Sequence, residues 1–271
     1  MSYDLYTSLL RMNDVFRPTD EGVEPTVDFT GPSLAELREK YDLPNIAGGG
    51  EAFTRAVRLM DWLTTHVRHD GSCNPEGKRC AMTALEYAFD QPDKGINCAW
   101  LATTLTECLL SLGIPARIVF IMPFAPYDSD NHVVTQVWTG TQWVMLDPTT
   151  NCYVMDKEGH LLDVFALRAL LADQQEVVFN DGLRYNGQPY DKTEHRDYLA
   201  KDLFWFRIME SESGRTLTIA PQGYDAHRRD VLNIEYRRRL YGDHEWLRSW
   251  QAAVEKEVTV YCSVEDARRA P

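Results

Sequence analysis

The sequence predicts an α+β fold, in which helices dominate the first 112 residues and strands follow them. Two observations indicate this class. Apolar residues recur at helical spacing up to residue 112, and β-type runs joined by a loop and a tight turn fill residues 116–147. Hydrophobic residues make up 44% of the 271 residues, which is enough for a packed core and excludes wholesale disorder. The length fits one large domain, or a core of roughly 150 residues with additions.

Helices are expected first along the chain. The first 32 residues contain three prolines and predict an irregular lead-in, and the three glycines at 48–50 mark a break. The elements expected next are a short helix that begins after Ser33 and ends at Tyr41, an amphipathic helix of about five turns over 53–67, a loop over 70–80 and a short helix over Met82–Phe89.

The clearest helix begins at Cys98. Asn97 before it is a good N-cap residue, and Gly113 followed by Pro115 is typical of a helix end. The apolar residues of one helix face are Leu101, Leu105, Cys108, Leu109 and Leu112. The sequence therefore predicts a helix over about Cys98–Leu112.

Strands follow this helix. The expected elements are strands over Ala116–Met122, His132–Trp138 and Gln142–Asp147, a polar loop over Pro123–Asn131 and a tight turn at residues 139–141. Beyond Pro148 the patterns weaken. They predict a helix over Asp163–Ala172, a core segment at Leu203–Phe206, strands over Thr216–Ala220, Val231–Leu240 and Val258–Val264, and a helix over Glu245–Lys256.

Cys98, His132 and Asp147 form a candidate catalytic triad. Cys98 lies in a predicted first helical turn, where the partial positive charge of the helix favours thiolate, the nucleophilic form of a cysteine. His132 opens a strand directly after a loop and is a candidate general base. Asp147 ends the partner strand, from which a carboxylate can orient the imidazole. Taken singly, each also has a structural explanation, namely a small buried residue, a strand-end histidine and a turn cap.

The register of the predicted hairpin decides whether His132 and Asp147 meet. A two-residue turn at Thr139-Gly140 places Trp138 opposite Thr141 and His132 directly opposite Asp147. A register two residues away makes His132 and Asp147 diagonal neighbours on the same face. A three-residue loop would put them on opposite faces, because side chains alternate along a strand. We expect the two-residue turn.

Four segments in this order resemble the transglutaminase-like superfamily. They are Gly95-Ile96-Asn97-Cys98-Ala99-Trp100, Leu112-Gly113-Ile114-Pro115-Ala116-Arg117, His132, and Trp143-Val144-Met145-Leu146-Asp147-Pro148-Thr149. The resemblance implies a papain-like core of bacterial type, with the nucleophile on a buried helix packed against an antiparallel sheet. It implies Cys98 as nucleophile, His132 as base and Asp147 as orienting carboxylate. Bacterial members usually carry an aromatic residue soon after the histidine, whereas Val133-Val134 follows here.

The resemblance also suggests how the chain is divided. We expect a helical or irregular lead-in over 1–50, a catalytic core over 51–165, and a C-terminal α+β extension over 166–271 that packs on the core. The backbone N–H of Cys98 is the expected first donor of an oxyanion hole. Gln91, upstream of the nucleophile, is a candidate second donor.

The leading functional hypothesis is a cysteine enzyme that acts on amide bonds of a peptide or protein through an acyl-enzyme, with no cofactor and no metal. Water as the acceptor makes it a peptidase or amidase, and an amine makes it a transglutaminase. Hydrolysis is favoured, because no calcium loop such as the EF-hand pattern is present. The alternatives are a transglutaminase-like binding or scaffold module, and an acyltransferase that uses a thioester donor.

Charge and hydropathy restrict the partners. The chain has 28 basic and 41 acidic residues and a net charge of −13, which disfavours nucleic acid and anionic membranes as partners. No apolar run approaches the ~18 residues of a membrane span, and the N-terminal segment does not resemble a signal peptide, so we expect a cytoplasmic protein. The sequence leaves the oligomeric state open.

Three further sets of residues have side chains that could form a site. The six cysteines are expected to be mostly free thiols, because a chain of this size does not need disulfides. The set His66, His69, Cys73 and Cys80 matches no common zinc motif by its spacing. Arg228-Arg229 and Arg237-Arg238-Arg239 are expected on a solvated face, and the alternative is that they hold a carboxylate-bearing substrate or a partner.

Overall fold

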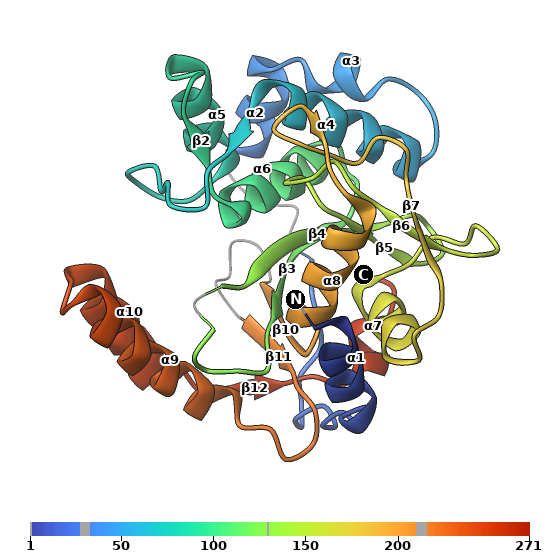
Figure 1. Cartoon of the computed structure of the whole chain (residues 1–271). Coiled ribbons are helices and arrows are strands. Elements are labelled where there is room, and N and C mark those ends of the chain that lie inside the picture. The colour runs from blue at the N-terminus through green and yellow to red at the C-terminus, as the bar shows by residue number, and fades with distance from the viewer. Residues whose placement is uncertain (1, 28–32, 129, 210–215) are drawn as a thin grey trace.

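A computed structural model describes residues 2–27, 33–128, 130–209 and 216–271 (Figure 1). The helices in these residues are α1 (Tyr3–Met12), α2 (Leu34–Lys40), α3 (Leu43–Ala47), α4 (Ala52–His66), α5 (Ala81–Asp90), α6 (Cys98–Ser111), α7 (Val164–Ala172), α8 (Lys192–Asp202), α9 (Ala226–Tyr241), α10 (Glu245–Lys256) and α11 (Val264–Ala267). The α+β class predicted from the sequence is confirmed.

A six-stranded sheet forms the centre of the molecule, in the order β12-β11-β10-β3-β4-β5. Its strands are β3 (Ala116–Met122), β4 (His132–Trp138), β5 (Trp143–Leu146), β10 (Trp205–Met209), β11 (Thr216–Ile219) and β12 (Val260–Tyr261). All neighbouring pairs are antiparallel except β11 and β12. The short strands β1 (Arg68–His69) and β2 (Gly95–Ile96), β6 (Val154–Asp156) and β7 (Val177–Phe179), and β8 (Arg184–Tyr185) and β9 (Gln188–Pro189) form three smaller pairs.

Helices cover both faces of this sheet (Figure 1). On one face, α6 packs on β3 and β4, and its apolar side chains share a buried cluster with Val137 and Val144. On the other face, α1, α7 and α8 pack on the side chains that alternate with those, such as Val134. Because α2, α4 and α5 cover α6, this helix is buried on nearly every side.

The predicted signals of α6 are confirmed. The Asn97 side chain accepts hydrogen bonds from the backbone N–H groups of Ala99 and Trp100, which caps the first turn. At the other end, Gly113 adopts φ +70°, and the N–H of Ile114 bonds back to Leu109. That left-handed conformation favours glycine and ends the helix after Ser111.

The hairpin of β4 and β5 has a longer loop than expected. Trp138 pairs with Trp143, so four residues connect the strands, and the direct pairing of His132 with Asp147 is wrong. The Thr139 hydroxyl donates to the Gln142 carbonyl and closes this loop, a contact that the turn dipeptide did not indicate. Because the shift is two residues, His132 and Asp147 are diagonal neighbours on one face.

Two segments adopt a different secondary structure from the one expected for them. The lead-in contains a regular helix, α1, which is held by tertiary packing of Leu10 against α7 and α8. Residues 28–32 of the lead-in lie outside the described residues. The strand expected over Val231–Leu240 is wrong, because this stretch lies within the helix α9. Asp225 caps α9 by accepting from the N–H of Arg228, and the arginines that follow are good helix formers.

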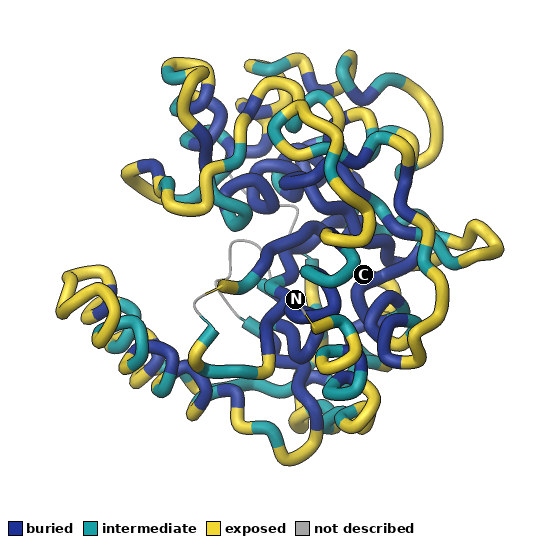
Figure 2. The backbone as a smooth tube through the Cα atoms, in the orientation of Figure 1, coloured by how far each residue is buried: buried dark blue, intermediate teal, exposed yellow. Residues whose placement is uncertain are grey.

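The helices α9 and α10 form a hairpin that extends from the body, with many exposed residues along it (Figure 2). The expectation of a solvated face for its arginines is wrong at Arg229. This side chain is buried, since it pairs with Asp230 and lies near the ring of Trp205. The segment Leu203–Phe206 is buried in the core, as predicted.

Arg117 has a structural role. It is buried on β3, where Nε and one terminal nitrogen donate to Oε1 of Gln136 at 3.1 and 2.8 Å. Its guanidinium lies 4.0 Å from the ring centre of Trp143. These contacts tie together the three strands that position His132 and Asp147.

Candidate active site

A cleft of about 560 Å³ opens where α6 and β4 begin. Cys98 and His132 contribute to its floor, and Asp147 lies directly beneath His132. The walls come from the loop after β1, the residues that follow Asp147, the hairpin of β8 and β9, and α8. Segments that are far apart in the sequence therefore meet around the cysteine.

His132 and Asp147 are in direct contact. Nε2 of His132 lies 2.8 Å from Oδ2 of Asp147, and both side chains are almost fully buried. Asp147 directly follows β5, and its backbone exchanges two hydrogen bonds with Cys152. The tight loop between them turns back over the carboxylate. Its Thr149 N–H donates to Oδ1, and the Thr150 hydroxyl donates to Oδ2.

Electrostatics favour an ion pair between these two side chains. Burial alone would lower the pKa of His132, but the charge and hydrogen bond of Asp147, together with the Cys98 thiol, raise this pKa well above its ordinary value. Burial would raise the pKa of Asp147, yet the His132 imidazolium and the Thr149 N–H hold this pKa well below its ordinary value. We infer that the imidazolium and carboxylate coexist near neutral pH.

Cys98 lies at the first position of α6 and is half-buried at the cleft floor. Gly95 helps to place it, because β2 runs against β1 here. A Cβ at Gly95 would come within 2.6 Å of the backbone at His69 and Asp70, so only glycine fits. The Asn97 side chain donates to Oδ1 of Asn74 at 2.6 Å, which ties the loop after β1 to the start of α6.

The candidate second oxyanion donor, Gln91, does not line this cleft. It ends α5, and its backbone takes part in the turn to Lys94. Asn74 does line the cleft, as Cys98 does, and its Oδ1 already accepts from Asn97, which precedes Cys98. The Asn74 amide N–H group is therefore a better candidate for the second oxyanion donor than Gln91. Its place beside the cleft depends on tertiary contacts, so the order of residues in the sequence does not indicate it.

Four cleft residues carry roles that the sequence did not indicate. The Tyr198 ring stands edge-on to His132, with ring centres 5.4 Å apart. His69 bonds to the Tyr185 hydroxyl through Nδ1, and burial lowers its pKa to about 4. His195 is fully buried beside Asp147. All of these come from α8 or from short strands whose patterns were too weak to predict.

None of the six cysteines, all of them among the described residues, forms a disulfide, in agreement with the prediction of mostly unpaired thiol groups. The residues of the candidate zinc set bond to different neighbours. His66 Nδ1 contacts the Trp62 carbonyl, and the Cys73 and Cys80 thiols contact the hydroxyls of Tyr87 and Thr83, respectively. Cys108 and Cys152 are buried, and burial raises the pKa of both thiols.

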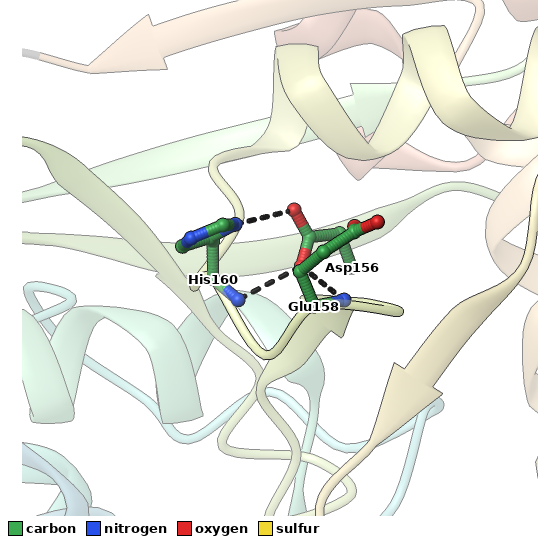
Figure 3. A group of neighbouring side chains, drawn as sticks. All are labelled: Asp156, Glu158 and His160. Carbon is green, nitrogen blue, oxygen red and sulfur yellow. Dashed lines mark hydrogen bonds and ion pairs between the residues drawn. The ribbon is translucent and has the colours of Figure 1, made fainter.

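In the described part of the chain, one group has the spacing to hold a metal ion, namely Asp156, Glu158 and His160 (Figure 3). It lies in the turn after β6, outside the cleft lining. His160 Nδ1 bonds to Asp156 Oδ2, and the backbone N–H groups of Glu158 and His160 bond to Oδ1. These contacts account for the cluster as an ordinary polar turn.

None of the described helices is both long and apolar enough to span a membrane.

Part of the chain is similar to a known protein family. Residues 43–148 match the model of the transglutaminase-like superfamily. Among solved structures, the "Putative Cysteine Protease from Cytophaga hutchinsonii" is similar, with 17% sequence identity and a TM-score of 0.36. That similarity covers 56% of this chain and 52% of the other, so it spans about half of each. No curated protein sequence matches the chain. Residues 43–148, which carry Cys98, His132 and Asp147, are therefore similar to the transglutaminase-like superfamily.

Proposed function

We propose that this protein is a cysteine enzyme that hydrolyses amide bonds through an acyl-enzyme on Cys98. The observation that carries the proposal is the meeting of Cys98, His132 and a buried Asp147 at one cleft. A binding module has no evident need for a buried carboxylate that holds an imidazole beside a half-buried thiol.

The chemistry follows from the placement of each group. The Cys98 sulfur attacks the substrate carbonyl, and the negative charge that develops on its oxygen is met by the Cys98 N–H and the Asn74 amide. His132 gives its proton to the leaving amine, and Asp147 holds the ring in orientation through Nε2. His132 then takes a proton from water, and the resulting hydroxide attacks the thioester carbonyl. The carboxylic acid is released, and the Cys98 sulfur leaves as thiolate beside the protonated His132.

A screen of peptide and side-chain amides tests this function, with mass spectrometry of the products. We expect the carboxylic acid and the free amine, and no product with Cys98→Ala. His132→Ala removes the base and Asp147→Asn the charge that holds the ring, so both lose activity by orders of magnitude. Thr141→Ser, in the exposed loop after β4, is the matched control that retains activity.

The same assay with excess primary amine tests water as the acceptor. If the amine adduct is the main product while water is freely available, the enzyme is a transferase and the hydrolytic part of the proposal is wrong. If no amide or thioester substrate acylates Cys98, and iodoacetamide labels it no faster than Cys73 or Cys80, the protein is a scaffold.

A further inference from the structure

His195 is a second histidine beside the triad carboxylate, and the chemistry above does not use it. It lies on α8, is fully buried, and forms part of the cleft wall. Its Nε2 is 3.3 Å from Oγ1 of Thr150 and 3.7 Å from Oδ2 of Asp147. Oδ2 is the same oxygen that contacts His132.

The hydrogen bonds around Thr150 fix the tautomer of His195. A threonine hydroxyl has one hydrogen, and Thr150 donates it to Oδ2 of Asp147 at 3.0 Å. Its oxygen must therefore accept from His195, so Nε2 carries the proton of a neutral ring. The opposite tautomer would point a lone pair at two oxygens. The buried Nδ1, which has no partner among the described residues, is consistent with an unprotonated nitrogen.

The surroundings keep this ring neutral and in place. The rings of Phe179 and Tyr190 lie against it, with centres 5.5 and 5.4 Å away. Burial lowers the pKa of His195 to about 4, although Asp147 opposes the shift, and the His132 charge lowers it further. The titratable groups that face it are thus Asp147, His132 and Tyr190, and burial raises the pKa of Tyr190 to about 12. Near neutral pH the carboxylate therefore has one charged histidine and one neutral one.

We propose that His195 is a positioning residue of the triad, which acts through the Thr150 hydroxyl to hold Oδ2 of Asp147 against His132. The inference rests on the proposed function, since it gives Asp147 its orienting role. His132 from β4 and the Thr150 hydroxyl from the loop after β5 both donate to Oδ2. His195 from α8 donates in turn to the Thr150 oxygen. The carboxylate cannot rotate away from His132 without breaking this chain of hydrogen bonds.

The test measures the titration of the His132 ring by NMR in protein with ¹⁵N-labelled histidine, which needs no substrate. His195→Phe keeps an aromatic ring between Phe179 and Tyr190 but removes the donor. We expect it to lower the proton affinity of His132 about fivefold, the effect of one net hydrogen bond. His195→Gln retains an N–H in place of Nε2–H and should restore the affinity to within about twofold.

Two further variants separate positioning from packing. Thr150→Val removes the hydroxyl that links His195 to Asp147, so it should lower the proton affinity of His132 at least as much as His195→Phe does. Adding His195→Phe to Thr150→Val should have no further effect. Thr150→Ser should restore the affinity. Phe179→Leu disturbs the packing of His195 without a hydrogen bond, so it should lower the melting temperature and leave the His132 titration unchanged. If His195→Phe does not fold, the two Thr150 variants decide the question.

The outcomes distinguish the two proposals. An unchanged His132 titration in His195→Phe, or a shift that His195→Gln does not restore, overturns the positioning role. The proposed function is judged separately, by whether His132→Ala slows the labelling of Cys98 with iodoacetamide. Suppose that His195→Phe lowers the proton affinity of His132, but His132→Ala leaves the rate of Cys98 labelling unchanged. This result supports the positioning role of His195 and overturns the proposed enzymatic function.

Discussion

Asp202 provides a test of the electrostatics beneath the cleft that requires no substrate. It ends α8 and is fully buried, and neither carboxylate oxygen has a hydrogen-bond partner among the described residues. Lys201 lies 3.4 Å away, but its charge is shared with Asp128 and Asp130 at 3.3 and 3.1 Å. Burial therefore outweighs the lysine and raises the pKa of Asp202 to about 8. The carboxyl is protonated in the folded protein at neutral pH.

The sign and size of the effect on stability follow from this shift. The ordinary pKa of 3.8 applies in the unfolded chain, so unfolding releases a proton at any pH between about 4 and 8. The contribution of Asp202 to the free energy of unfolding is therefore greatest below about pH 4, and it is lost progressively as the pH rises to about 8. At about 1.4 kcal/mol per pH unit, the loss at pH 7 is up to about 4 kcal/mol. Asp202→Asn removes the titration and should recover most of it.

Urea unfolding of the unsubstituted protein and of Asp202→Asn between pH 4 and pH 9 measures the difference in their free energies of unfolding directly. The stability gain of Asp202→Asn should be near zero at pH 4 and rise steadily to a plateau above pH 8. Asp130→Asn is the matched control, since it also removes a partner of Lys201 but leaves Asp202 in place. A gain that does not vary with pH, or a loss at neutral pH, would refute the reasoning and show Asp202 to be ionised and paired with Lys201.

Three other predictions follow from the site. Brief iodoacetamide treatment at mildly acidic pH should modify Cys98 before Cys73 and Cys80, and peptide mapping that finds either of these first contradicts the proposal that Cys98 is the nucleophile. Gly95→Ala should lower the free energy of unfolding in urea by about 1–3 kcal/mol, because the added Cβ meets the backbone at His69 and Asp70. Gly49→Ala has open space around it and should be close to neutral. Equal effects of the two substitutions would show that β1 and β2 separate freely. Asn74→Ala should lower kcat about 10²-fold with KM little changed if its amide meets the oxyanion, and a rise in KM alone would assign it to substrate binding.

The sequence indicated the residues of the candidate site, but not the contacts between them. Cys98 was identifiable because an N-cap, a helix face and a terminating glycine define α6 locally. His132 and Asp147 were identifiable because their strands flank a short turn. These signals depend on residues close together in the chain, where local conformation and sequence are directly linked.

The residues that surround the candidate site come from segments distant in the sequence, so the sequence did not indicate them. Asn74, Thr150 and His195 acquire their roles because the loop after β1, the loop after β5 and α8 meet at one cleft. Nothing near His195 in the sequence distinguishes it from an ordinary helical histidine. The helix α9 was missed for a related reason, since its side chains pair with residues such as Asp243 and Gln251 of the following segment instead of forming a regular apolar stripe.

The hairpin shows why an incorrect register can still bring His132 and Asp147 to the same face. The loop has four residues where two were expected, so the partner of every residue on β4 was wrong. Side chains alternate with a period of two, however, so any even change of loop length leaves His132 and Asp147 on the same face. The two-residue offset makes the contact diagonal, and the histidine ring spans it through Nε2, leaving Nδ1 for the side of Cys98. A loop longer or shorter by one residue would send the carboxylate to the face of α6, which is why loop length at Thr139–Gln142 constrains this site more strongly than loop sequence.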